Sequence, residues 1–152
     1  MATMTSKFFT FFFKYVDPVI ALGGAYLNFF DQNTAVTGMA PNSRYDPDQV
    51  FLFHQSGGLA LAVAFLSAAI PRRSNDITTW RILQFSIFLS DLAGMSGAFF
   101  ALLRQGRLAP TAWTSDDLGA GGTYVFLTLV RVAFLLYTQD GRNAGQFVKE
   151  KA

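Results

Sequence analysis

Three charged residues interrupt otherwise apolar stretches of this chain: Asp17, Asp91 and Arg131. A charged side chain at mid-depth in a bilayer costs about 2.5 to 3.5 kcal/mol, so each is expected to have a partner. The helical rise of ~1.5 Å per residue puts all three about 10 to 17 Å from the same end of the expected helices. The sequence therefore predicts that Asp17, Asp91 and Arg131 meet inside a helical bundle.

Such a meeting point places two acids beside one base, which allows two interpretations. If Arg131 compensates only one carboxylate, desolvation and like-charge repulsion favour a proton on the other. A neutral carboxylic acid beside an apolar cavity can donate that proton to a substrate, which makes Asp17, Asp91 and Arg131 candidate catalytic residues. The alternative is a buried ion-pair triad that fixes the register of the helices. A cavity beside the acids would favour chemistry, and a packed triad would favour structure.

Other polar side chains on the expected helices are candidates for binding a substrate. Asn28 lies on one face with Asp17, and Gln84 lies two turns before Asp91. His54 and Tyr124 are expected nearer the opposite end, at the mouth of a pocket, although a single histidine there is more often an amphipathic residue without a role. The candidate substrate-binding residues are therefore Asn28, His54, Gln84 and Tyr124.

The composition is that of a membrane protein. Of 152 residues, 51% are hydrophobic and 14% are charged, against about 25% charged in soluble proteins. The absence of cysteine excludes disulfides and thiol catalysis, and the single histidine disfavours a zinc site. We expect no metal and no cofactor. The net charge of +2 with scattered basic residues indicates no nucleic-acid partner.

Apolar segments of sufficient length predict an all-α, integral-membrane bundle of four transmembrane helices, at about 8–30, 50–70, 79–103 and 119–139. One domain is expected over 1–152, with a polar outer loop at 31–49 and a polar C-terminal tail at 140–152. Pro18 is expected to kink the first helix. It should also push Asp17 out of helical geometry, so that Asp17 caps the second half of that helix.

Basic residues outside the expected spans are unevenly distributed, and this predicts an orientation. The side that holds both termini is the richer one, so the positive-inside rule places the N and C termini in the cytosol. The residues counted are Lys7, Arg72, Arg73, Arg81, Arg142, Lys149 and Lys151, against Arg44, Arg104 and Arg107. Without a signal for another address, the expected location is the endoplasmic reticulum or a related endomembrane.

The segment 17–26, with the sequence DPVIALGGAY, resembles the first span of a family of small fungal integral-membrane proteins of unknown function. The four-span layout also resembles the EXPERA proteins, which include the emopamil-binding sterol isomerases, and more loosely the fungal membrane-bound terpene cyclases. These groups use intramembrane acids to protonate an alkene or epoxide in a lipophilic substrate. The resemblance implies no position for their catalytic residues in this chain.

Two functions are expected from this pattern. The first is an intramembrane, acid-catalysed isomerase or cyclase of a terpenoid, sterol or polyketide-like intermediate in secondary metabolism. The second is a non-catalytic lipid-binding or scaffold membrane protein with a structural Asp/Arg cluster. The expected partners are the lipid bilayer and a lipophilic small molecule, and the sequence leaves homo-oligomerisation open.

Overall fold

The computed structural model describes the backbone of residues 6–150 and the side chains of residues 6–138. Its helices are α1 (Lys7–Phe11), α2 (Asp17–Phe30), α3 (Gln32–Met39), α4 (Val50–Arg73), α5 (Ile77–Arg104) and α6 (Ser115–Glu150). A π-helical turn, η1 (Phe12–Val16), joins α1 to α2, and two 3₁₀ turns lie at η2 (Pro47–Gln49) and η3 (Pro110–Ala112). The all-α class is therefore confirmed.

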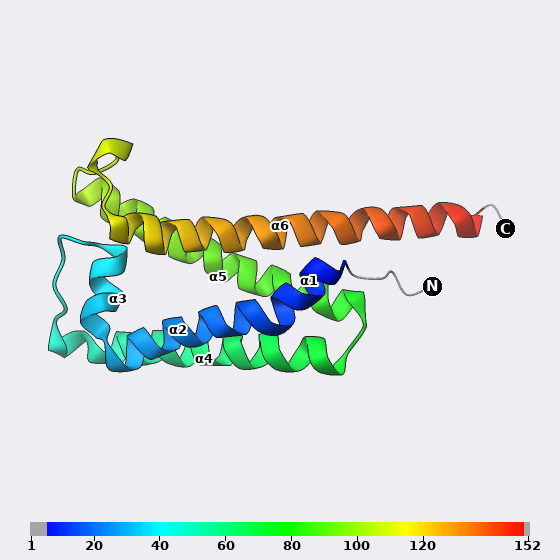
Figure 1. Cartoon of the computed structure of the whole chain (residues 1–152), viewed down its shortest axis with the longest axis horizontal. Helices are drawn as coiled ribbons and strands as arrows, with labels where there is room; N and C mark the ends of the chain where they lie inside the picture. The colour runs from blue at the N-terminus through cyan, green and yellow to red at the C-terminus, as the bar shows by residue number, and fades with distance from the viewer. Residues whose placement is uncertain (1–5, 151–152) are drawn as a thin grey trace.

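Four segments are long and apolar enough to cross a membrane, and they match the four predicted spans with small shifts at their ends. They are Lys7–Phe30, Pro47–Arg73, Ile77–Arg104 and Ser115–Thr138. The chain runs back and forth, so the start of α1 and the end of α6 lie at the same end of the bundle (Figure 1). This end is called the terminal end below; the side of the membrane that it faces stays a prediction.

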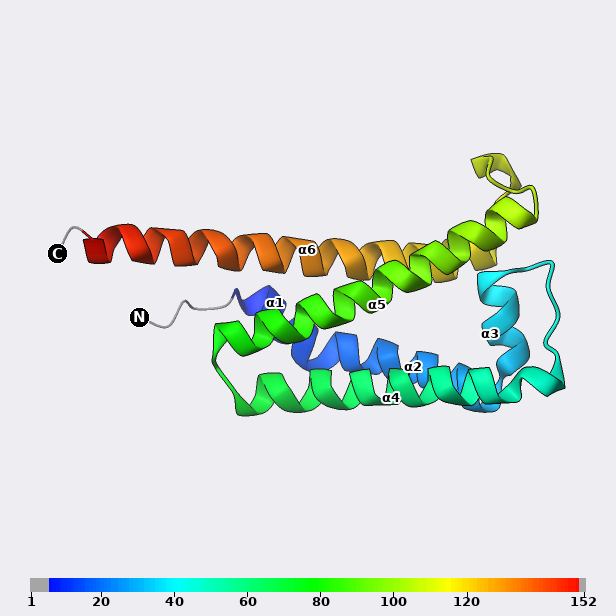
Figure 2. The same cartoon turned by 180° about the vertical axis from the view of Figure 1, so that it is seen from behind.

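The helices form two antiparallel pairs, because α2 packs most extensively on α4 and α5 on α6. Figures 1 and 2 show α2 beside α4 along their length, while α5 runs obliquely from the end of α4 to α6. Helix α3 lies across the end opposite the termini, where it contacts α5 and α6. The pairs are thus connected at one end by α3 and at the other by side chains described below.

The first span is irregular one turn before Pro18. The backbone N–H of Asp17 donates to the carbonyl of Phe12, which is the wider π-helical pattern. A proline ring in a regular helix clashes with the carbonyl four residues earlier, here that of Lys14, and the wider turn lies at this place. Asp17 itself has helical angles (φ −56°, ψ −47°). The predicted departure of Asp17 from helical geometry and its capping role were wrong, because its carboxylate binds other helices instead.

An aromatic core fills the terminal end of the bundle. Phe13 and Phe134 lie at its centre, with ring centroids 5.1 Å apart in an edge-to-face arrangement. Trp80 is buried in this core, and its indole N–H donates to the Ser74 carbonyl at 2.7 Å. The buried members of this aromatic core are Phe9, Phe12, Phe13, Trp80, Leu127, Val130 and Phe134.

The predicted outer loop and the predicted polar tail both contain helix. The predicted outer loop at 31–49 includes α3, whose first turn is capped by the Asp31 side chain accepting from the Thr34 N–H at 3.2 Å. A helix of eight residues is too short to show a clear hydrophobic period, so the sequence pattern missed it. Helix α6 also continues to Glu150, through the predicted polar tail.

Helices α5 and α6 approach closely where Gly94 lies under the ring of Tyr124. A Cβ atom at Gly94 would lie 2.5 Å from Cε1 of Tyr124. We predict that Gly94→Ala lowers the free energy of unfolding by about 1 to 3 kcal/mol through overpacking, measured by thermal unfolding in detergent micelles. The matched control is Gly97→Ala, because a Cβ there meets no atom within 4 Å. Equal stabilities of the two variants would contradict this account of the helix contact.

Candidate functional site

The guanidinium of Arg131 lies at the centre of a group of buried polar side chains. Its Nε donates to Oδ2 of Asp91 at 2.6 Å, and its Nη2 donates to Oδ1 of Asp17 at 2.6 Å. Its Nη1 donates to Oε1 of Gln84 at 2.5 Å. The three bonds tie α6 to α2 and twice to α5. The structure therefore brings Asp17, Asp91 and Arg131 together, as their depths along the helices predicted.

A fourth helix joins through Ser67 of α4, whose hydroxyl donates to Oδ2 of Asp17 at 2.9 Å. Each of the four candidate spans thus contributes to one hydrogen-bonded network. We call it the polar cluster; its members are Asp17, Ser67, Gln84, Asp91 and Arg131. Sequence reasoning missed Ser67, because it stands in a run of Ala, Leu, Val and Phe. The available signal was its hydroxyl, the one polar side chain in the segment 59–70.

The polar cluster is enclosed by protein. Arg131 and Asp17 are each 2% exposed, and Asp91 is 6% exposed. Charges taken out of water are tolerated when they are paired and hydrogen-bonded, and Arg131 supplies this to both acids. By the criterion stated from the sequence, this packing favours a structural role over a catalytic one.

The two acids are held differently. Asp17 accepts one bond from Arg131 and one from Ser67, so both of its oxygens are occupied. Asp91 accepts its hydrogen bond from Arg131 through Oδ2 and is the more exposed acid. The Nε2 group of Gln84 is buried without a hydrogen-bond partner among the described residues. Two carboxylates and one guanidinium share the cluster, so acids outnumber bases within it.

The predicted substrate-binding residues do not come together. Gln84 is in the polar cluster, whereas Asn28 donates to the Gly24 carbonyl of its own helix at 2.8 Å. His54 is exposed, with its ring 5.4 Å from that of Phe29. Tyr124 is half-buried beside Gly94. Among the described residues, no hydrogen bond joins Asn28, His54 and Tyr124 to one another.

An ion pair outside the polar cluster fixes the loop between α5 and α6. Arg107 binds Asp117 with two bonds, of 2.5 Å from Nη1 and 3.0 Å from Nη2. Asp117 also accepts from the Thr114 N–H at 2.7 Å, and the Thr114 hydroxyl accepts from the Asp117 N–H at 3.3 Å. This reciprocal pattern is a capping box with an aspartate in the usual glutamate position. The spacing of Thr114 and Asp117 is the sequence signal that could have identified it.

Comparison with known protein families gives one match, over residues 2–140, to a domain of unknown function (DUF7704). The chain belongs to this family. The matched range contains the four candidate spans and all members of the polar cluster. No curated protein and no solved structure matches the chain. The family description gives no activity, so any function must be argued from the geometry.

Arg131 is the residue whose removal should destabilise the bundle most. We predict that Arg131→Met lowers the free energy of unfolding by about 3 to 5 kcal/mol, because two buried carboxylates then lose their cation. Thermal unfolding in detergent, followed by circular dichroism, measures this. Adding Asp17→Asn and Asp91→Asn to Arg131→Met should restore part of the loss. The control is Arg104→Met, since Arg104 is exposed; similar losses for both arginines would refute the structural account.

The bond from Ser67 gives a second, smaller effect. We predict that Ser67→Ala costs about 1 to 3 kcal/mol, because a buried oxygen of Asp17 loses its donor. Ser56→Ala, on the same helix at an exposed position, carries the same change in helix propensity without that loss. The same thermal measurement compares the two variants, and the prediction fails if Ser67→Ala is as stable as Ser56→Ala.

Proposed function

We propose that this protein is a non-catalytic, lipid-binding membrane protein whose polar cluster holds its four spans together. The observation that carries the proposal is that the cluster is packed. Arg131 donates hydrogen bonds to three cluster members, and the Ser67 hydroxyl donates a fourth bond, to Asp17. The residues concerned are almost entirely buried. A proton donor must reach its substrate, and Asp17 has both oxygens bound by its own protein.

The outward surfaces support the lipid-binding part of the proposal. Of the most apolar 18 residues of α5, 11% are buried, and for the span that contains α4 the value is 17%. Large side chains such as Phe65, Phe85 and Phe99 are more than half exposed. Exposed apolar surface on this scale needs acyl chains or partner helices around it. The same surfaces leave room for contact with a second copy of the chain.

The proposed orientation has both termini in the cytosol, in the endoplasmic reticulum or a related endomembrane. It rests on the excess of Lys and Arg at the terminal end of the bundle, where Arg72 and Arg73 close α4.

A second function, an acid-catalysed isomerase or cyclase of a lipophilic intermediate, is favoured by one observation. The polar cluster has two carboxylates for one guanidinium, so a bound proton would balance its charge. Asp91 is the better proton donor of the two acids, because it is more exposed than Asp17. It lies one helical turn before Gly94, where α5 contacts Tyr124. In this function Asp91 protonates the substrate while Arg131 keeps Asp17 ionised.

A replacement experiment in the source organism separates the two functions. The chromosomal copy is replaced by wild type, Asp91→Asn or the control Ser90→Asn, and lipophilic extracts are compared by liquid chromatography and mass spectrometry. We expect the same terpenoids, sterols and polyketides from all three strains. We also expect each purified protein to retain the same bilayer lipids, since Asn can still accept the bond from Arg131.

The opposite result would establish chemistry. If Asp91→Asn is as stable as wild type by thermal unfolding yet one product disappears and an isomeric precursor accumulates, the cluster is catalytic and the non-catalytic proposal is wrong. Ser90→Asn, on the neighbouring exposed position, should not change the extract in either case.

A further inference from the structure

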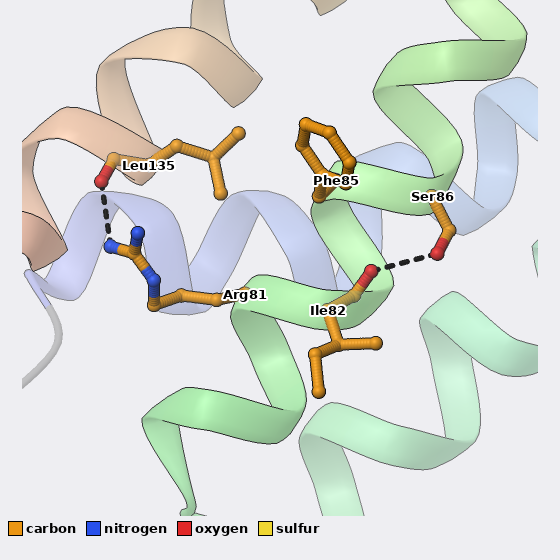
Figure 3. Close-up of a pocket in the computed structure, with 5 residues that line it drawn as sticks. All are labelled: Arg81, Ile82, Phe85, Ser86 and Leu135. Carbon is orange, nitrogen blue, oxygen red and sulfur yellow. Dashed lines mark hydrogen bonds between the residues drawn. The ribbon is translucent and has the colours of Figure 1, made fainter.

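A shallow groove runs along the outer surface between α5 and α6, near the terminal end of the bundle. It is open to the outside, has a volume of about 420 Å³, and is lined by Arg81, Ile82, Phe85, Ser86 and Leu135. Figure 3 shows Arg81 at one end of the groove, reaching toward Leu135 of α6. None of the residues that line the groove belongs to the polar cluster.

The groove has one polar end and an apolar remainder. The Arg81 guanidinium is held in place through Nη1, which donates to the Leu135 carbonyl at 2.7 Å and to the Thr138 hydroxyl at 2.6 Å. The Ser86 hydroxyl donates to the Ile82 carbonyl at 2.9 Å, so it is satisfied within its own helix. Arginine has five N–H groups, and among the described side chains Nε and Nη2 of Arg81 have no acceptor, so a phosphate can use them.

The polar end and the apolar floor of the groove follow one another in the same order as the headgroup and the acyl chain of a bilayer lipid. Arg81 lies in the second turn of α5, next to the turn that joins α4 to α5, at the level expected for a headgroup. Phe85 follows one turn later, about 6 Å further from that end of the helix. A lipid bound here would place its phosphate on Arg81 and an acyl chain over Ile82, Phe85 and Leu135, in the same orientation as the leaflet around it.

The charge nearby favours an anionic lipid. Arg72 and Arg73 end α4 at the same end of the bundle. The one acid in the turn, Asp76, caps α5, and hydrogen bonds from Thr79 and Thr78 hold the pKa of that carboxyl below its usual range. The three arginines therefore outnumber it. The predicted orientation places this end in the cytosolic leaflet, which is the leaflet rich in anionic lipids.

We infer that this groove binds one anionic glycerophospholipid, with the phosphate on Arg81 and an acyl chain on the apolar floor. The inference rests on the proposed lipid-binding function and names its site and lipid class. A second copy of the chain is the other occupant that could cover the groove, and the experiment below distinguishes it.

Native mass spectrometry of the full chain in mild detergent tests the inference, with short-chain phosphatidylglycerol and phosphatidylcholine titrated separately. We expect wild type to bind phosphatidylglycerol at least about ten-fold more tightly than phosphatidylcholine, because the choline ammonium offsets the phosphate charge and is repelled by Arg81. Arg81→Gln should abolish this preference, and Arg81→Lys should keep most of it. Arg104→Gln removes an exposed arginine near the far end of α5 and should leave it unchanged.

A variant that fills the groove keeps the test independent of the contacts that Arg81 makes with α6. Ser86→Trp places a large ring over the floor without touching the guanidinium, and it should weaken phosphatidylglycerol binding about ten-fold while thermal unfolding is unchanged. If wild type binds neither lipid, both the inference and the lipid-binding function fail. If lipids bind but Arg81→Gln and Ser86→Trp behave as wild type, only the inference fails. The same holds if the groove is instead covered in a dimer that Ser86→Trp disrupts.

Discussion

The arrangement of this protein depends on one guanidinium. Arg131 donates through Nε, Nη1 and Nη2 to acceptors on two other helices, and Ser67 extends the network to the fourth. The flat, forked shape of arginine makes this geometry available, whereas the ammonium of lysine is a compact charge on a flexible stem. Because the donors point in fixed directions, the network sets the rotation and the height of each helix at once.

Packing at the same end of the bundle reinforces this constraint. The aromatic core joins the first span to α6 through Phe13 and Phe134, close in sequence to Asp17 and Arg131. On α5, the buried residues lie between Trp80 and Asp91. Contacts between the two helix pairs are therefore concentrated near the termini, while the opposite half depends on pairwise packing, on α3 and on the Arg107 to Asp117 bridge.

Hydropathy and the rise of a helix predicted most of the fold and the meeting of the three charges, because both depend on position along the chain. They do not specify the rotation of a helix about its axis or its local hydrogen bonds. Asn28 has the right height, but its amide bonds to its own helix, and His54 faces outward. Ser67 was missed because a single hydroxyl hardly changes the apolar character of a span. The π-helical turn before Asp17 was also not predictable, because a proline in the sequence does not specify which helical turn widens to avoid the clash with its ring.

The bond between Arg131 and Asp17 joins positions 114 residues apart. A chain is synthesised from its N-terminus, so the helices that carry Asp17 and Asp91 are made before the one that carries Arg131. Until α6 is complete, Ser67 is the only cluster member that donates to Asp17. Three helices alone would enclose two acids without a cation. The final helix therefore supplies the one cation that both acids share, so the polar cluster is complete only when α6 has joined the other three helices.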